Sequence, residues 1–195
     1  MIVTEKIDGT NAAVGIKLID DAGAYKASRS ALVSTPVPGG NGITFAVYAQ
    51  SRKRLISPMD DNFGFARWVW ENAEELANTL GPGLHFGEWW GEGIQRGYGI
   101  DGKRFSLFNT HRWGWMLGDS FKGQGIFTQL SCVPVIGAFG VSLPVAQEVL
   151  FDVGKHGSYA VPGFMNPEGI CLYLPDVGKT YKMTFDGDQP KGMAA

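Results

Sequence analysis

Hydrophobic and polar residues alternate along several short stretches of the chain, and this period of two is the pattern of β-strands with one buried face. The pattern predicts strands over residues 12–19, 25–33, 45–55, 84–90, 104–109, 111–117, 132–137, 168–174 and 181–185. Clusters of Gly, Pro, Asn and Asp separate these stretches, as at 20–23 and 35–42, and predict turns and loops. Strands therefore dominate the predicted secondary structure.

Two stretches have the spacing of helices instead. The first runs from about Gly64 to Leu80, and Asp61 or Asn62 can cap it. Its apolar face is formed by Phe65, Val69, Ala73, Leu76 and Leu80. The second runs from about Val145 to Lys155 and ends near Gly157. Many short strands with two interrupting helices predict an α+β fold built around antiparallel sheets.

Composition narrows the class of protein further. A chain of 195 residues with 44% hydrophobic residues is expected to form one globular domain over 1–195, with a polar, flexible tail from about residue 186. The net charge of −2 gives no overall basic field for nucleic acid, although a local basic face remains compatible with it. Two cysteines in apolar runs predict buried thiols and a reducing, cytoplasmic compartment, and no stretch predicts a membrane span.

The most informative residue is Lys6, in the run Glu5-Lys6-Ile7-Asp8-Gly9-Thr10-Asn11. Further runs follow it in order: Phe86-Gly87-Glu88, Phe105-Ser106-Leu107-Phe108-Asn109, Pro167-Glu168-Gly169-Ile170 and Tyr181-Lys182-Met183-Thr184. This ordered set resembles the covalent nucleotidyltransferases, which include ATP-dependent ligases and mRNA capping enzymes. The set is most similar to RNA ligases of the RNA-ligase-2-like type, and the resemblance extends from Thr4 to about Lys191.

The resemblance implies a fold and a size. The implied fold is the ATP-grasp-like adenylation domain of the nucleotidyltransferases. An OB-fold follows the last motif in DNA ligases and capping enzymes, and we expect none here because the sequence ends soon after Lys182. Relatives carry residues before the lysine motif, so a missing N-terminal segment or an accessory protein is expected to complement a monomeric chain.

The resemblance also implies three catalytic roles. Lys6 would attack the α-phosphate of ATP, release pyrophosphate and form a lysyl-AMP phosphoramidate, provided that its amine first loses its proton. Glu168 would support a catalytic Mg²⁺ (or Mn²⁺), largely through water, since Mg²⁺ keeps several waters and uses one or two carboxylates. Lys182 would neutralise charge on the α-phosphate. Some relatives have a second lysine where this chain has Thr184, and Lys179 is a candidate to replace it.

The remaining candidates would bind the nucleotide. Around the nucleophile these are Glu5, Ile7 and Asn11, and further along the chain they are Arg52, Glu88, Phe108 and Lys179. Arg52 is the candidate to grip phosphate with a planar guanidinium, and Arg29, in the other Ser-Arg pair, is the alternative. Phe108 resembles the ring that stacks on adenine, although packing in the core explains it as well. Relatives often have Asp where this chain has Asn109.

The combined expectation is an ATP-dependent RNA ligase that acts in RNA repair on RNA ends or nicked duplexes. It would adenylate Lys6, transfer AMP to an RNA 5′-phosphate and seal that end to a 3′-hydroxyl. A related DNA ligase or GTP-using nucleotidyltransferase is one alternative, because no residue is identified that reads a ribose 2′-hydroxyl. The other alternative is a non-catalytic module on the same fold that binds nucleic-acid ends.

Overall fold

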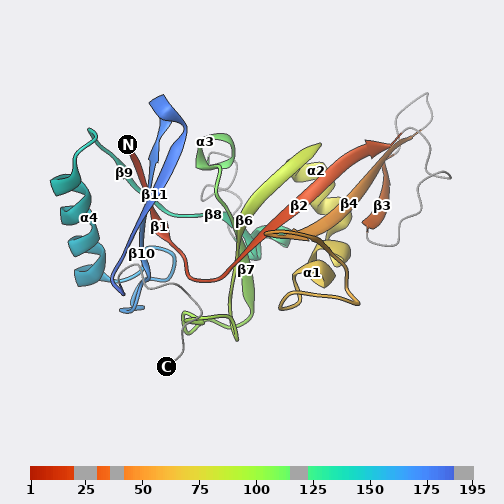
Figure 1. The fold of residues 1–195 in the computed structure, drawn as a ribbon. Helices are drawn as coiled ribbons and strands as arrows, with labels where there is room; N and C mark the ends of the chain where they lie inside the picture. The colour runs from red at the N-terminus through yellow and green to blue at the C-terminus, as the bar shows by residue number, and fades with distance from the viewer. Residues whose placement is uncertain (20–29, 36–41, 115–122, 187–195) are drawn as a thin grey trace. The chain divides into compact units, whose positions relative to one another are not determined.

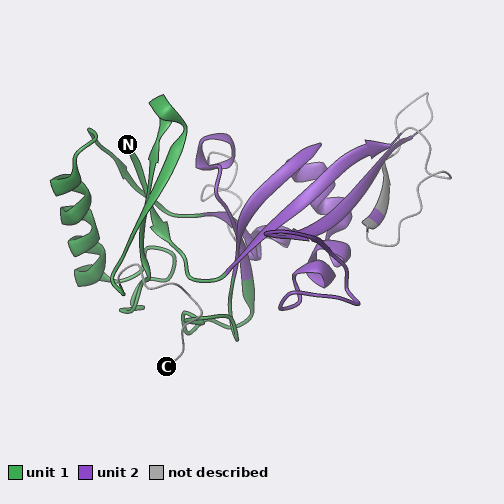
Figure 2. Ribbon diagram, viewed as in Figure 1, with its two compact units in different colours: residues 1–9, 90–103, 133–195 green, residues 10–89, 104–132 purple. Residues whose placement is uncertain are grey.

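The computed structural model of the chain describes residues 1–19, 30–35, 42–114 and 123–186. Over these residues the fold is α+β, with two mainly antiparallel sheets and few helices (Figure 1), so the predicted fold class is confirmed. The chain divides into two compact units (Figure 2): residues 1–9, 90–103 and 133–195, and residues 10–89 and 104–132. Within the described residues no helix combines the length and the apolar character needed to cross a membrane.

The first unit contains a four-stranded antiparallel sheet. Its strands lie in the order β11 (Lys179–Thr184), β10 (Gly169–Leu174), β1 (Ile2–Lys6) and β9 (Val135–Ala138). A 3₁₀ turn over Pro175–Val177 connects β10 to β11. The predicted strands at 168–174 and 181–185 are confirmed, whereas β1 was not predicted. Its buried positions are Val3 and Glu5, so a buried carboxylate interrupts the apolar alternation that would predict a strand.

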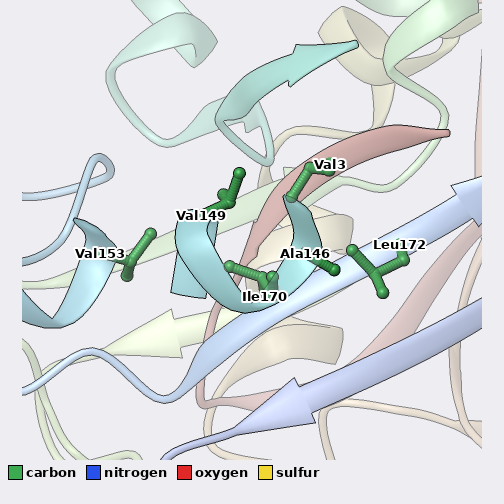
Figure 3. Packing of buried hydrophobic residues seen from close by; sticks show 6 residues of the cluster. All are labelled: Val3, Ala146, Val149, Val153, Ile170 and Leu172. Atoms are coloured by element: carbon green, nitrogen blue, oxygen red, sulfur yellow. The ribbon is translucent and has the colours of Figure 1, made fainter. Parts of the chain in front are cut away.

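Helix α4 (Leu143–His156) packs against one face of this sheet, which confirms the second predicted helix. A proline in its first turn is compatible with helix, and Gly157 ends the helix with a φ of 85° that suits glycine. Its buried residues contact buried residues of β1 and β10 (Figure 3); the six are Val3, Ala146, Val149, Val153, Ile170 and Leu172. Full burial of a Val, Leu or Ile side chain stabilises by about 1.5–3 kcal/mol. This cluster therefore fixes the strand that ends at Lys6.

The sheet of the second unit has seven strands. Six of them lie in the order β3 (Ser30–Thr35), β4 (Ile43–Ser51), β2 (Thr10–Ile19), β6 (Gly83–Gly91), β7 (Lys103–Leu107) and β8 (Leu130–Cys132), and β5 (Leu55–Ile56) pairs with β4. The pair β7–β8 is parallel. The predicted strands at 12–19, 84–90 and 104–109 are confirmed, and the part of the predicted 25–33 strand before Ser30 lies outside the described residues.

The predicted helix at 64–80 is two helices, α1 (Phe65–Glu71) and α2 (Ala73–Leu80). Asn72 separates them because its side-chain amide donates to the Trp68 carbonyl at 2.8 Å and its backbone leaves the helical region. The N-cap residue of α1 is Gly64 and not the predicted Asp61 or Asn62, but the Asp61 carboxylate accepts hydrogen bonds from the first-turn amides of Ala66 and Arg67. Rings from these helices and the sheet form the core: Phe65, Trp68, Trp89 and Phe105, with centroids 5.0–5.8 Å apart.

Three further predictions need correction. The stretch 111–117 is not a strand at its start: Thr110–Trp113 is the short helix α3, because the Asn109 side chain accepts the Arg112 N–H at 3.0 Å and caps it. The predicted strand 45–55 turns at 51–54, where the Ser51 N–H donates to the Arg54 carbonyl at 2.9 Å. The predicted strand 132–137 is divided between β8 and β9, with a 3₁₀ turn over Gly125–Thr128 before β8.

Candidate active site

Lys6 is the last residue of β1, and its ammonium group forms an ion pair with the carboxylate of Glu168. Glu168 directly precedes β10, and both side chains are largely shielded from water, with 20% of Lys6 and 7% of Glu168 exposed. The cross-strand neighbour of Lys6 is Gly169. Gly169 has a φ of 152°, and a β-carbon there would collide with the Met183 carbonyl. The close packing at Gly169 places Glu168 beside Lys6.

Lys182 lies on the same face of the sheet as Lys6. Opposite residues of antiparallel strands share a face, and successive residues alternate between faces. Lys6 is in register with Gly169 and Thr184, and the next row on that face consists of Thr4, Cys171 and Lys182. Helix α4 packs on the other face through Val3, Ile170 and Leu172. Two of the three predicted catalytic residues therefore project from the face opposite α4, and Glu168 contacts one of them.

Lys179 does not share that face with Lys182. Lys179 pairs with Leu174 on the neighbouring strand. Within β11 it shares a face with Tyr181 and Met183, and Met183 packs against the α4 cluster. Thr184 instead occupies the row of Lys6, where some relatives have a lysine. The geometry of the strand thus puts Thr184, rather than Lys179, on the face of Lys6.

Glu5 lies beside Lys6 in sequence but points to the α4 side of the sheet, where it is 1% exposed. Its carboxylate accepts hydrogen bonds from the Ser158 hydroxyl and the Ala160 N–H, each at 2.7 Å. Burial raises the pKa of Glu5, and these hydrogen bonds offset part of that rise. Glu5 therefore anchors the segment after α4, a contact between residues far apart in the sequence that the sequence analysis did not foresee.

The two residues after Lys6 are also held within the first unit. The Ile7 side chain is buried with Trp90, Tyr98 and Val133. Asp8 donates its backbone N–H to the Tyr98 hydroxyl at 2.8 Å, and its Oδ2 lies 3.2 Å from Nε of Arg96. From the sequence, Arg96 and Tyr98 belong to a tract that is typical of RNA ligases, and Arg96 is a candidate for a local basic face, but no spacing relates either residue to Lys6.

The second unit contains a different pair of predicted residues. Asn11 on β2 and Glu88 on β6 are directly opposite in the register, so their side chains share one face of that sheet. Both are half-buried. The neighbours of Glu88 on the opposite face, Gly87 and Trp89, are buried, as expected for a strand that is covered on one side. Asn11 and Glu88 thus form a polar pair that can bind one ligand.

Arg52 lies in the tight turn between β4 and β5 and is exposed. The preceding residue, Ser51, pairs with Ala12, so the turn lies next to the start of β2, where Asn11 is found. The neighbouring Arg54 forms an ion pair with Asp60. The alternative phosphate ligand, Arg29, lies outside the described residues, so the choice between the two arginines stays a prediction.

Phe108 follows β7 directly, and 42% of its side chain is exposed. Its backbone N–H donates to the Phe86 carbonyl at 3.0 Å, which ties it to β6 near Glu88. Phe86 is exposed to a similar degree, at 45%. An aromatic side chain with this exposure is not enclosed in the core.

The described residues contain no cluster of three or more His, Cys, Asp or Glu side chains of the kind that encloses a metal. A single shielded carboxylate, Glu168, next to Lys6 fits a hard cation that keeps most of its waters and is otherwise bound by substrate phosphates. The cysteines do not contribute: the two do not form a disulfide, and burial raises the pKa of Cys132 to about 12.

The chain was compared with models of protein families, with curated proteins and with solved structures. The family model described as RNA ligase matches residues 1–175, which include Lys6, Glu88, Phe108 and Glu168. No curated protein and no solved structure matches the chain.

Proposed function

The chain belongs to the RNA ligase family, and from this premise we propose that it is an ATP-dependent RNA ligase that works through a lysyl-AMP intermediate at Lys6. The observation that carries the proposal is the ion pair between Lys6 and Glu168, where Lys6 shares the sheet face opposite α4 with Lys182. We further propose that residues 1–195 have the ATP-grasp-like fold of the nucleotidyltransferases.

The first step of the proposed reaction is nucleotidyl transfer to Lys6. The neutral amine of Lys6 attacks the α-phosphorus of ATP, a P–N bond forms, and the bond to the bridging oxygen breaks so that its electron pair leaves with pyrophosphate. An ammonium has no lone pair to attack with. Glu168 is the carboxylate in contact with Lys6, so it is the nearest group that can take the proton.

Charge stabilisation is the second requirement, because phosphoryl-transfer catalysis consists mostly of positioning and electrostatics. Lys182 shares the face of Lys6 and is exposed, so its ammonium can approach an α-phosphate bound there. A Mg²⁺ or Mn²⁺ ion supported by Glu168 would supply further positive charge at the phosphates when it is bound. Glu168 then has two roles in sequence, as partner of Lys6 and as partner of the cation.

The later steps transfer AMP to an RNA 5′-phosphate and join that phosphate to a 3′-hydroxyl with release of AMP. For the nucleoside, Asn11 and Glu88 supply a polar pair that can bind ribose hydroxyls, and Phe108 supplies an exposed ring for the base. Arg52 is the proposed phosphate ligand from the turn beside β2.

The proposal is tested by incubating the protein with α-labelled ATP or α-labelled GTP and Mg²⁺, followed by a denaturing gel. We expect a labelled protein band with ATP that disappears when unlabelled RNA with a nick is added, because AMP then passes to the 5′-phosphate. A band with GTP instead supports the GTP-using alternative. No band with either nucleotide, together with binding of RNA ends, supports the non-catalytic module.

Phe108 provides a prediction about nucleotide binding. Phe108→Leu is expected to raise the Kd for ATP about tenfold or more, since stacking of a base on an aromatic ring is worth about 1–3 kcal/mol. Calorimetric titration with ATP measures it. The matched control is Phe86→Leu, which removes a ring of similar exposure and should leave the Kd unchanged. Equal affinities of Phe108→Leu and the parent would show that the ring does not stack on adenine.

A second prediction concerns the polynucleotide. With a net charge of −2 the chain is expected to bind RNA weakly. If local contacts with phosphates supply most of the binding free energy, the binding constant should fall steeply as the salt concentration rises. Sealing should therefore be faster at a nick in duplex RNA, where base pairing aligns the ends, than between unpaired ends. Joining assays at two salt concentrations compare nicked RNA, nicked DNA and unpaired RNA. Preference for the all-DNA nick would favour a DNA ligase, and efficient joining of unpaired ends at high salt would contradict the expected weak binding.

A further inference from the structure

Arg96 contacts three separate segments of the first unit with one guanidinium group. Its Nε lies 3.2 Å from Oδ2 of Asp8, its Nη1 donates to the Asn166 side-chain oxygen at 2.7 Å, and its Nη2 forms an ion pair with Asp186. The side chain is 15% exposed, so these contacts are largely shielded from water. A planar guanidinium with fixed donor directions can make such contacts at once, whereas a lysine ammonium cannot reach all of them.

The three partners lie close in sequence to the proposed catalytic residues. Asp8 comes two residues after Lys6, and Asn166 comes two residues before Glu168. Asp186 follows the end of β11, the strand that bears Lys182. Arg96 thus joins the ends of the three segments on which the proposed chemistry depends.

The backbone of the loop that carries Arg96 is strained at two positions. Gln95 and Tyr98, on either side of Arg96, have positive φ angles of 47° and 55°, a backbone region that costs free energy for residues other than glycine. Such strained residues persist only where surrounding contacts determine them. Here the contacts are those of Arg96 and those of Tyr98.

Tyr98 holds Asp8 from a second direction. Its ring is 1% exposed and packs against Trp90 and Phe164, with centroids 4.9 and 4.7 Å away. Burial raises the pKa of Tyr98, so the hydroxyl stays neutral, and it accepts the Asp8 N–H at 2.8 Å. The loop over residues 95–98 therefore contacts Asp8 twice, through an ion pair between the Arg96 guanidinium and the carboxylate, in which Nε donates no hydrogen bond, and through the Tyr98 hydroxyl that accepts the backbone N–H.

On the basis of the proposed function, we propose that Arg96 is a positioning residue that sets the maximal rate of nucleotidyl transfer to Lys6. It acts by holding Asp8 and the segment before Glu168, which together determine where the amine and its carboxylate partner lie. Its guanidinium nitrogens face Asp8, Asn166 and Asp186, so it is not a free phosphate ligand. The contact with Asp186, which is 70% exposed, is the weakest of the three because solvent screens it.

The experiment measures the single-turnover rate of lysyl-AMP formation at saturating ATP, the Kd for ATP and the melting temperature. Arg96→Met is expected to lower the maximal rate roughly 10- to 100-fold, the scale of a small misplacement of reacting groups, with the Kd for ATP little changed. Arg96→Lys should restore only part of the rate, because it keeps the charge without the fixed contacts. Asp186→Asn should change the rate less than about threefold.

The control is Arg54→Met, which removes an arginine that also pairs with a carboxylate but in the second unit, and it should keep the parental rate. A double-mutant cycle with Asp8→Asn measures the coupling between Arg96 and Asp8 in the maximal rate. A general loss of stability would not produce such coupling. If Arg96 acts through Asp8, Arg96→Met should lower the maximal rate little further in the Asp8→Asn background.

The outcomes separate this inference from the proposed function. The inference is overturned, and the proposed function is not, if Arg96→Met keeps the parental maximal rate. The same holds if both Arg96 variants lose rate only in proportion to the fraction of protein that is unfolded. Additive losses in the double-mutant cycle likewise overturn it. A parent protein that forms no lysyl-AMP overturns the proposed function and this inference together.

Discussion

Lys6→Ala is expected to abolish covalent labelling by α-labelled ATP, while the parent gains the mass of one AMP. The physical reason is that in the proposed reaction the amine is the attacking group, and an alanine methyl group has no lone pair to replace it. Intact-mass measurement after incubation with ATP and Mg²⁺ gives the number of bound AMP groups, and mapping of the labelled peptide gives the site. The P–N bond of a lysyl phosphoramidate is labile in acid, which distinguishes it from a phosphodiester on a hydroxyl.

Lys155→Ala is the matched control for Lys6→Ala. Lys155 is an exposed lysine in the last turn of α4, so its removal should leave labelling at the parental level. The melting temperature of Lys6→Ala should be compared as well, because Glu168 loses its partner in this variant. Label that persists in Lys6→Ala would show that another residue is the nucleophile.

The class of fold was predictable because most strands are half-buried, and half-burial leaves a period of two in the sequence. The errors arise where a local hydrogen bond overrides that pattern. Asn72 and Asn109 each bond to nearby backbone, so one helix is divided into two and a predicted strand begins as a helical turn. Strand β1 is stabilised by its pairing with β9 and β10, partners that alternation within five residues cannot reveal.

The candidate site was only partly predictable, for a related reason. The resemblance to RNA ligases pointed to Lys6 and Glu168 as site residues. The structure places the two side chains in contact although 162 positions separate them. The bond between Glu5 and Ser158 spans 153 positions, and that between Arg96 and Asn166 spans 70. No period or spacing in the sequence encodes such pairs, because tertiary folding alone brings them together. Lys179 and Lys182 lie three residues apart in β11 and therefore on opposite faces, which the sequence did not show because it predicted the strand only from residue 181.

Glu168→Gln is expected to lower the rate of adenylation by roughly 10²-fold or more, the scale of losing one electrostatic stabiliser in an active site. Glutamine keeps the size of the side chain and an oxygen that can accept from Lys6, so packing is conserved. It removes the negative charge that can take the proton of Lys6 and support a divalent cation. The single-turnover rate of lysyl-AMP formation, measured across a series of Mg²⁺ concentrations, tests the expectation.

The stability of this variant separates a catalytic role from a structural one. Breaking a fully buried ion pair costs about 3–5 kcal/mol, but Lys6 is 20% exposed and water can solvate part of its charge, so the melting temperature should fall only slightly. The control is Glu75→Gln in the second unit, where the carboxylate accepts the Ile126 N–H at 3.0 Å, and this variant should keep the parental rate. A large loss of melting temperature in Glu168→Gln with normal adenylation at saturating Mg²⁺ would assign Glu168 to folding. A large loss of rate in a stable protein would instead mean that the carboxylate serves the transfer of AMP to Lys6.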